Sequence, residues 1–223
     1  MFSVGVITAD ELGHSLNEPN FVDKLHVFAA KHSHAHSISD MSPIYDSDDK
    51  PPKINELITL YPSAVITYFA PNDLSGIGGM HSECIHATHI WRKEGPHYDT
   101  VFVSTNSDKD SMCGLNVTWV RQFFSFKCQG CIYPCAVIQW YSHCGDEPDG
   151  GTGMWVVEPD MHEDGKHIID IIHLDTIVCS AYLIAVYGDN PIPKDIPLCY
   201  TLDLFHLYYV NKFIDHDAFE ITF

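Results

Sequence analysis

Basic residues are scarce in this sequence. Arg92 and Arg121 are its two arginines, and 12 Lys and Arg residues stand against 30 Asp and Glu residues, which gives a formal net charge of -18. Neutralisation of phosphates by Lys and Arg supplies most of the non-specific affinity of proteins for DNA. The charge balance therefore disfavours direct nucleic-acid binding by this chain alone.

Long apolar runs are also missing. No window holds 18 uninterrupted apolar residues, so we expect no transmembrane helix. The first residues contain no basic segment and reach Asp10 and Glu11 early, which argues against a secretory signal. We expect no membrane association and an intracellular location, nuclear or cytoplasmic, where the eight cysteines would be reduced thiols rather than disulfides.

Hydrophobic residues make up 45% of the chain, which is ample for a core. Residues 1–53 predict an irregular N-terminal segment and linker, although residues 21–30 have the apolar spacing of one helical face. From residue 54 to 188 the chain predicts a β-rich domain, because short β-branched and aromatic runs alternate with turns. The expected strands are 54–62, 63–70, 100–104, 120–126, 132–141, 154–157, 167–174 and 183–187.

Two short helices are expected beside these strands. Asp175 can cap a helix that ends near Ala181. In the segment 189–223, a linker is followed by a helix from Thr201 to about Phe213, with apolar residues on one stripe. The predicted fold class is mainly β (α+β): a small curled antiparallel sheet or barrel with a C-terminal helix and an irregular N-terminal region.

The stretch 120–160 carries half of the cysteines. Gln129-Gly130 predicts the turn of a hairpin. Around this turn, Cys128, Cys131, Cys135 and Cys144 (with His143 adjacent) have part of the spacing of a zinc site. Only the first pair has the usual separation, and Cys135 lies within a strand whose alternate side chains diverge. The alternatives are a zinc-binding module with these ligands and buried or accidental cysteines without a cofactor.

Several motifs resemble the C-terminal segment of fungal Plavaka-type DNA-transposon proteins, which are transposase-like. They are Tyr68–Met80 (YFAPNDLSGIGGM), Tyr133–Ala136, Gly145–Asp149, Thr152–Val157 and Tyr209–His216. The resemblance runs from roughly Ile58 to Phe223. It implies that the catalytic acidic residues of the family lie upstream of these residues, so none is carried over to this sequence. The resemblance thus implies a non-catalytic interaction or accessory module.

The sequence departs from the family at positions where arginine is usual. Here it has His81, Ser82, Cys84 and His86, and also Cys113, His143 and Cys179. A single C-to-T change, on one DNA strand or the other, can convert a CGN arginine codon to Cys or His. We therefore interpret the chain as a decayed copy of the transposon protein, which would explain its two arginines and part of its negative charge.

Other patterns suggest weaker sites. His32, His34 and His36 suit a transition metal but lie in a linker-like tract. The acidic loop 145–151 lacks the ligand spacing of an EF-hand. Carboxylates beside histidines leave a metal-dependent hydrolase as a third alternative. Aromatic residues between Trp119 and Trp155 predict a core, with one or two of them at a groove that binds a protein or peptide partner.

Overall fold

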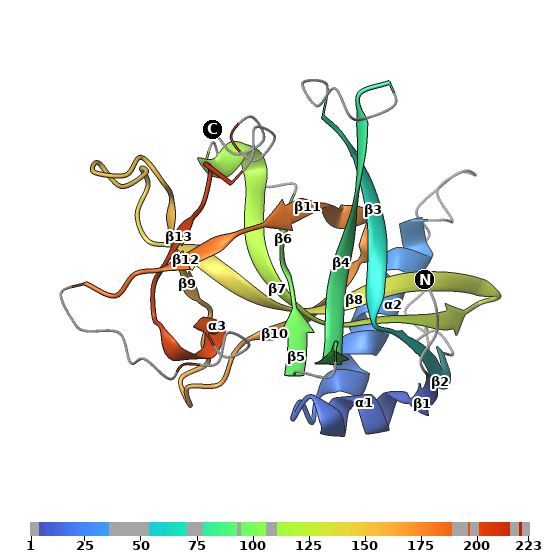
Figure 1. Cartoon of the computed structure of the whole chain (residues 1–223). Helices are drawn as coiled ribbons and strands as arrows, with labels where there is room; N and C mark the ends of the chain where they lie inside the picture. The colour runs from blue at the N-terminus through green and yellow to red at the C-terminus, as the bar shows by residue number, and fades with distance from the viewer. Residues whose placement is uncertain are drawn as a thin grey trace.

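The computed structural model describes residues 5–35, 54–70, 78–92, 95–105, 111–188, 196, 201–214 and 219. Strands dominate this part of the chain, and the largest sheet is antiparallel and curls into a half-barrel (Figure 1). The predicted mainly β fold is therefore confirmed. None of the helices in the described ranges is long and apolar enough to cross a membrane.

The elements follow one another from the N-terminus to the C-terminus as a helical start, a long run of strands and a short C-terminal helix. They are β1 (Gly5–Thr8), α1 (Ala9–Ser15), α2 (Phe21–Ala35), β2 (Ile54–Tyr61), β3 (Ser63–Phe69), β4 (Met80–Trp91), β5 (Gly95–Tyr98), β6 (Thr100–Ser104), η1 (Ser111–Gly114), β7 (Leu115–Cys128), β8 (Cys131–His143), β9 (Val156–Pro159), β10 (Ile169–His173), η2 (Leu174–Thr176), β11 (Ile177–Ala181), β12 (Leu183–Ala185), α3 (Thr201–Leu204) and β13 (Tyr208–Val210).

Two sheets organise these strands. In the larger sheet the main path is β1-β2-β7-β8-β9-β13-β12, while β10 pairs with β8 and β6 joins β11 to β7. The smaller sheet has the order β3-β4-β5, and its long β3–β4 hairpin stands across the larger sheet in Figure 1. Strands β3 and β4 pack against β11, and β4 also packs against β7. The smaller sheet therefore forms a wall beside the curled one.

The β7–β8 hairpin is the centre of the fold. Its turn residues Gln129 and Gly130 have φ angles of 50° and 85°, the positive values that a two-residue type I′ turn requires. Cys128 and Cys131 face each other across this turn. The predicted hairpin turn is confirmed.

Both faces of this hairpin are buried. Trp119, Phe123 and Ile138 belong to one apolar cluster, which also includes Tyr208 of the C-terminal region. Neighbouring side chains of the same strands, among them Phe124 and Phe126, belong to a second cluster with Phe21, Leu25 and Phe28 of α2. Because successive residues of a strand point to opposite faces, one hairpin serves as the shared layer between two cores.

The N-terminal residues contain more regular structure than the sequence predicted. Thr8 Oγ1 accepts a hydrogen bond from the backbone N–H of Glu11 (3.2 Å), and Glu11 Oε2 accepts one from the backbone N–H of Thr8 (2.7 Å). This capping box fixes the start of α1. Helix α2 then buries Phe21 and Leu25 against the sheet. Residues 5–35 are therefore part of the fold, α2 confirms the helical spacing of residues 21–30, and residues 36–53 lie outside the described ranges.

The two helices expected after Asp175 and after Thr201 are much shorter than predicted, because strands occupy most of their predicted ranges. The chain from Ile177 to Ala181 is strand β11, and only the short 3-10 turn η2 precedes it. Near the C-terminus, α3 ends at Leu204 and β13 follows, paired with β9 and β12. Tyr208 and Val210 are buried while Tyr209 between them is only half-buried. This alternation is the pattern of a strand, so sheet pairing outweighs the helical spacing of the apolar residues.

Candidate functional site

A groove of about 840 Å³ lies between the β4–β5 hairpin on one side and β11, residues 182–183 and α3 on the other. Aromatic side chains from both sides line it: Trp91, Tyr98, Trp119 and Tyr182. Its lining also holds the two carboxylates of Glu83 and Asp99, and no Lys or Arg among the described residues. The groove is thus aromatic and acidic.

The carboxylate of Glu83 fixes one wall of the groove to the other. Glu83 lies on β4 and accepts a hydrogen bond from the backbone N–H of Ser180 on β11 (2.9 Å). Its second oxygen accepts a hydrogen bond from the Tyr68 hydroxyl (3.1 Å). Hydrogen bonds to a charged acceptor are stronger than neutral ones. Glu83 therefore holds β3, β4 and β11 in a defined relation.

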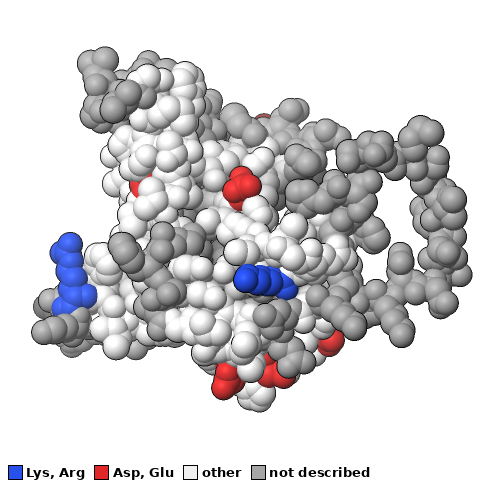
Figure 2. Space-filling view, turned by 90° about the vertical axis from the view of Figure 1, so that its right-hand side faces the viewer, with Lys and Arg blue, Asp and Glu red and all other residues white. Residues whose placement is uncertain are grey.

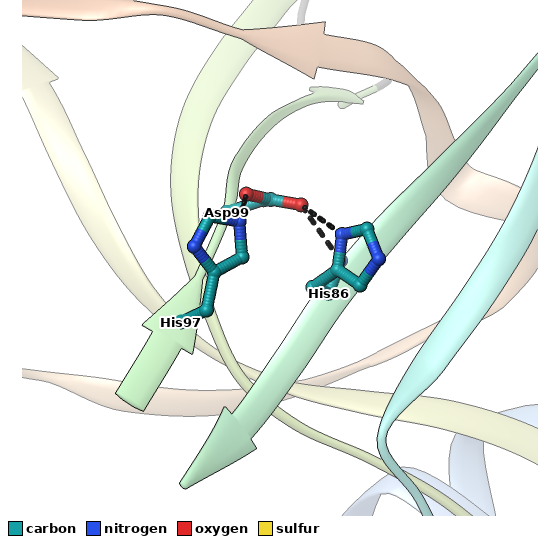
Figure 3. Close-up of side chains that lie close together, drawn as sticks. All are labelled: His86, His97 and Asp99. Carbon is teal, nitrogen blue, oxygen red and sulfur yellow. Dashed lines mark hydrogen bonds and ion pairs between the residues drawn. The ribbon is translucent and has the colours of Figure 1, made fainter. Parts of the chain in front are cut away.

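Two imidazoles and one carboxylate meet at the β4–β5 wall of the groove. His86 lies on β4, His97 on β5, and Asp99 directly follows β5. Asp99 Oδ2 is 3.2 Å from His86 Nδ1, and Asp99 Oδ1 is 2.9 Å from His97 Nε2. One nitrogen or oxygen from each of the three side chains lies within 4.8 Å of the other two. Figure 3 shows Asp99 between the two rings.

Strand pairing produces this convergence. His97 and Asp99 are two residues apart and so project to the same side. Thr88 pairs with His97, and Ala87 with Tyr98, which places His86 opposite Asp99. The backbone N–H of Asp99 donates to the carbonyl of His86 (2.9 Å), and the backbone N–H of His86 donates to Asp99 Oδ2 (2.7 Å). The carboxylate is therefore held by backbone and side-chain contacts.

Trp91 and Cys84 surround the two imidazoles. The indole of Trp91 stacks on the His97 ring with centroids 5.3 Å apart, and meets the His86 ring edge-on at 4.3 Å. The Nε2 atom of His86 is 3.6 Å from the Cys84 sulfur. His86 and Asp99 have 20% and 25% of their side-chain surface exposed, and His97 has 44%. The cluster is thus half-buried and open to solvent on the His97 side.

Arg121 fixes the aromatic floor of the groove. It follows Val120 at a β-bulge in β7, and its guanidinium lies 4.2 Å from the Trp119 ring centroid and 4.8 Å from that of Tyr98. Burial raises the pKa of Tyr98, and the positive charge of Arg121 opposes part of this rise. Such cation–π contacts hold ring orientation. The two rings are therefore set in place before any ligand arrives.

The four cysteines of the predicted zinc site are spread along the β7–β8 hairpin. Cys128 and Cys135 are buried, Cys131 is exposed, and Cys144 follows the far end of β8. Thirteen residues of extended chain from Cys131 to Cys144 cover roughly 40 Å of strand path. Within the described ranges, the group with metal-binding spacing is His86, His97 and Asp99, and it includes none of these cysteines. Zinc at the cysteines stays a prediction.

Burial also makes two of these thiols poor nucleophiles. It raises the pKa of the Cys135 thiol strongly and that of Cys128 to a smaller degree. The thiolate is the form that binds metal. Cys135 belongs to the apolar cluster around Phe124 and Phe126, so its side chain fills core space.

Other predicted sites have structural roles or lie outside the described ranges. Asp149 in the acidic loop accepts hydrogen bonds from the backbone N–H groups of Gly151 and Thr152 and from the Thr152 hydroxyl, which lower its pKa. His32 belongs to α2 and stacks on Phe28 at 4.0 Å. His36 and the loop 71–77 fall outside the described residues.

Comparison with known proteins identifies no relative. No protein-family model, no curated protein and no solved structure matches this chain. The function therefore has to be argued from the groove and its side chains.

Proposed function

We propose that this chain is a non-catalytic interaction module, which holds an extended segment of a partner protein in the aromatic groove. The observation that carries this proposal is the groove itself, about 840 Å³ in volume and lined by Trp91, Tyr98, Trp119 and Tyr182. Aromatic side chains give large contact areas at low cost in conformational entropy, and they are enriched at binding hot spots.

An edge strand favours an extended partner. Strand β5 is the last strand of the three-stranded sheet, and its residues Gly95–Tyr98 line the groove. Peptides commonly bind by adding a strand to such an edge, with backbone hydrogen bonds for affinity and alternate side chains for specificity. The groove offers the aromatic surface that such alternate side chains need.

Charge favours a basic partner. The chain has a net charge of -18, and the described lining of the groove contains Glu83 and Asp99 without Lys or Arg. On the face shown in Figure 2, the described surface is mainly uncharged and its acidic and basic side chains stand apart. Complementary charge sets the choice of partner and the association rate. We therefore expect a Lys- or Arg-containing segment that also carries an aromatic or aliphatic anchor.

Selection from a random peptide library tests this proposal. We expect the selected peptides to be basic, and we expect Tyr182→Ala to weaken the best of them at least about tenfold in fluorescence polarisation, as for a hot-spot residue. Tyr187→Ala is the matched control, since the two tyrosines are 40% and 42% exposed and Tyr187 does not line the groove. Acidic peptides, or equal losses in both variants, would refute the proposal.

The origin of the chain belongs to the same proposal. The motifs from Tyr68 to His216 support descent from the C-terminal segment of a fungal Plavaka-type transposon protein, in a decayed copy, with a nuclear or cytoplasmic location. A longer transposase-like reading frame directly upstream in the genome is expected. Decay also predicts that C-to-T and G-to-A transitions predominate among the differences between this coding sequence and other genomic copies of the element. Equal frequencies of all substitution types would exclude it.

Two alternative functions, a zinc-binding module and a metal-dependent hydrolase, are tested separately. A zinc-binding module at Cys128, Cys131, Cys135 and Cys144 predicts one tightly held zinc ion that is lost in Cys128→Ser. A metal-dependent hydrolase predicts turnover that depends on a carboxylate and a histidine in one cavity. The interaction module is preferred because its groove is supported by both aromatic lining and charge.

A further inference from the structure

We propose that His86, His97 and Asp99 form a binding site for a divalent transition-metal ion of the zinc class in the wall of the groove. The inference goes beyond the proposed peptide binding and does not depend on it. It rests on the convergence of the three side chains, with His86 Nδ1 and His97 Nε2 on opposite oxygens of one carboxylate.

The ligand set fits this class of ion. Imidazole nitrogen and carboxylate oxygen bind zinc at about 2.0–2.2 Å, so ligand atoms of one ion lie within about 4 Å of each other. The three groups already lie within 4.8 Å of one another. Small rotations of the rings and of the carboxylate would admit an ion between them, because the strands that carry them are already paired. Preorganisation of this kind is what a metal site requires.

Charge supplies a second argument. Within the described residues, the ion-pair partners of Asp99 are the two histidines, and neither Lys nor Arg is paired with it. Glu83 and Asp99 both line the groove, and a bound divalent cation is the largest counter-charge that such a site can acquire. The two carboxylates therefore attract the ion, against the positive charges of Arg121 beside Trp119 and Tyr98 and of Arg92 beside Trp91.

The surroundings match those of a ligating histidine. Metal-bound histidines usually donate their second ring N–H to a nearby acceptor. His86 Nε2 is 3.6 Å from the Cys84 sulfur, and the stacked indole of Trp91 limits rotation of His97. With His86 bound through Nδ1, its Nε2–H faces this sulfur. Three protein ligands leave one tetrahedral position for water or for a group of a bound partner.

Cobalt(II) titration of the purified chain tests the site, since tetrahedral Co²⁺ absorbs visible light and Zn²⁺ does not. We expect saturation at one Co²⁺ per chain and displacement by zinc, the ion for which tetrahedral His and carboxylate ligands are typical. His97→Ala is expected to raise the dissociation constant at least about tenfold, because even the loss of an outer-shell partner costs 10–100-fold. Asp99→Asn is expected to do the same and keeps one hydrogen-bond acceptor.

His89→Ala is the matched control, because His89 is an exposed histidine of the same strand β4 and lies outside the cluster. We expect it to bind Co²⁺ like the unaltered chain. The proposal is overturned if Co²⁺ gives no saturable absorption, if His97→Ala binds as well as the unaltered chain, or if His89→Ala loses binding equally. Circular dichroism of each variant shows whether it is folded, and His97, 44% exposed, is the variant least disturbing to the fold.

The titration is done without peptide, and the peptide selection is done in the presence of a chelator. A chain that binds metal but no peptide supports the metal site and removes the interaction module. A chain that selects basic peptides but takes up no Co²⁺ supports the interaction module and refutes the metal site. The two proposals therefore fail separately.

Discussion

Two hairpins of this molecule carry side chains that suit metals, and they differ in burial and in their position in the fold. The β7–β8 hairpin holds Cys128, Cys131 and Cys135, and both of its faces are buried between two apolar clusters. The β4–β5 hairpin holds two histidines and leads to a carboxylate, and it is partly exposed on the wall of a groove. The first hairpin forms the core of the fold, and the second carries the side chains of the proposed metal site.

The difference teaches that ligand spacing along a strand is a poor guide to a metal site. Residues of one extended strand separate by about 3.3 Å each and alternate between faces. Cysteines at positions 131, 135 and 144 therefore diverge. His86 and Asp99 are distant in sequence, yet antiparallel pairing sets them opposite each other. The spacing of His97 and Asp99 on one segment and the register of β4 against β5 together bring the three side chains close to one another.

Removal of a core ring from the first hairpin should have the largest effect on stability. Phe124 is 1% exposed and contacts the ring of Phe21 in α2. Phe124→Ala should lower the free energy of unfolding by about 3–5 kcal/mol, because it leaves a cavity. Ile132→Ala, on the same hairpin but 61% exposed, is the control and should cost less than about 0.5 kcal/mol. Equal midpoints in urea would contradict a structural role for this hairpin.

Thiol reactivity distinguishes buried from accessible cysteines on the same hairpin. Cys131 is exposed, whereas burial raises the pKa of Cys135 and hides its sulfur. At pH 8 an alkylating reagent should modify Cys131 faster than Cys135 by roughly two orders of magnitude, since the thiolate is the reactive species. Mass spectrometry of digested protein measures both rates. Comparable labelling of the two in the native protein would show that β8 is not packed as described.

The hairpin turn should show a smaller, conformational effect. Gly130 has a φ of 85° and an added Cβ would meet no atom within 4 Å. Gly130→Ala should therefore cost about 1–2 kcal/mol from backbone strain alone. Gly150→Ala is matched, because that glycine also has open space but no positive φ, and it should be close to neutral. A neutral result at Gly130 in thermal unfolding would argue against the type I′ turn.

The second hairpin should tolerate change with the smallest effect on stability. His97 is 44% exposed, so His97→Ala should shift the free energy of unfolding by less than about 1 kcal/mol without metal, as for a surface ion pair. Added zinc should raise the melting temperature of the unaltered chain more than that of the variant, because a ligand of the native state stabilises it. An equal rise in melting temperature in both proteins would show that His97 is not a zinc ligand.

Much of the fold was predictable because its signals are local. The alternation around Gln129-Gly130 and the short β-branched runs gave the main strands and the turn. The helix expected after Thr201 failed because Leu202, Phe205 and Tyr209 have helical spacing, while pairing with β9 and β12 holds Tyr208–Val210 as a strand. Pairing with a neighbouring strand therefore overrides the helical spacing of apolar residues where such a strand is available.

Less of the candidate site than of the fold could be predicted from the sequence. The pattern His97-x-Asp99 was a usable signal, since alternate residues of a strand share a face. The contribution of His86 depends on strands β4 and β5 and on their register, and neither strand was among those expected from the sequence. Of the aromatic residues between Trp119 and Trp155, Trp119 lines the groove. The other lining aromatics, Trp91, Tyr98 and Tyr182, reach it through tertiary packing, and partner binding there stays a prediction.

X-ray absorption at the zinc edge, on the chain loaded with one zinc ion, tests the contrast between the two hairpins most directly. The site at His86, His97 and Asp99 predicts a first shell of nitrogen and oxygen at about 2.0–2.2 Å and no sulfur. A shell of sulfur atoms at about 2.3 Å would place the ion on the cysteines of β7–β8. That result would contradict the assignment of the chemistry to the β4–β5 wall.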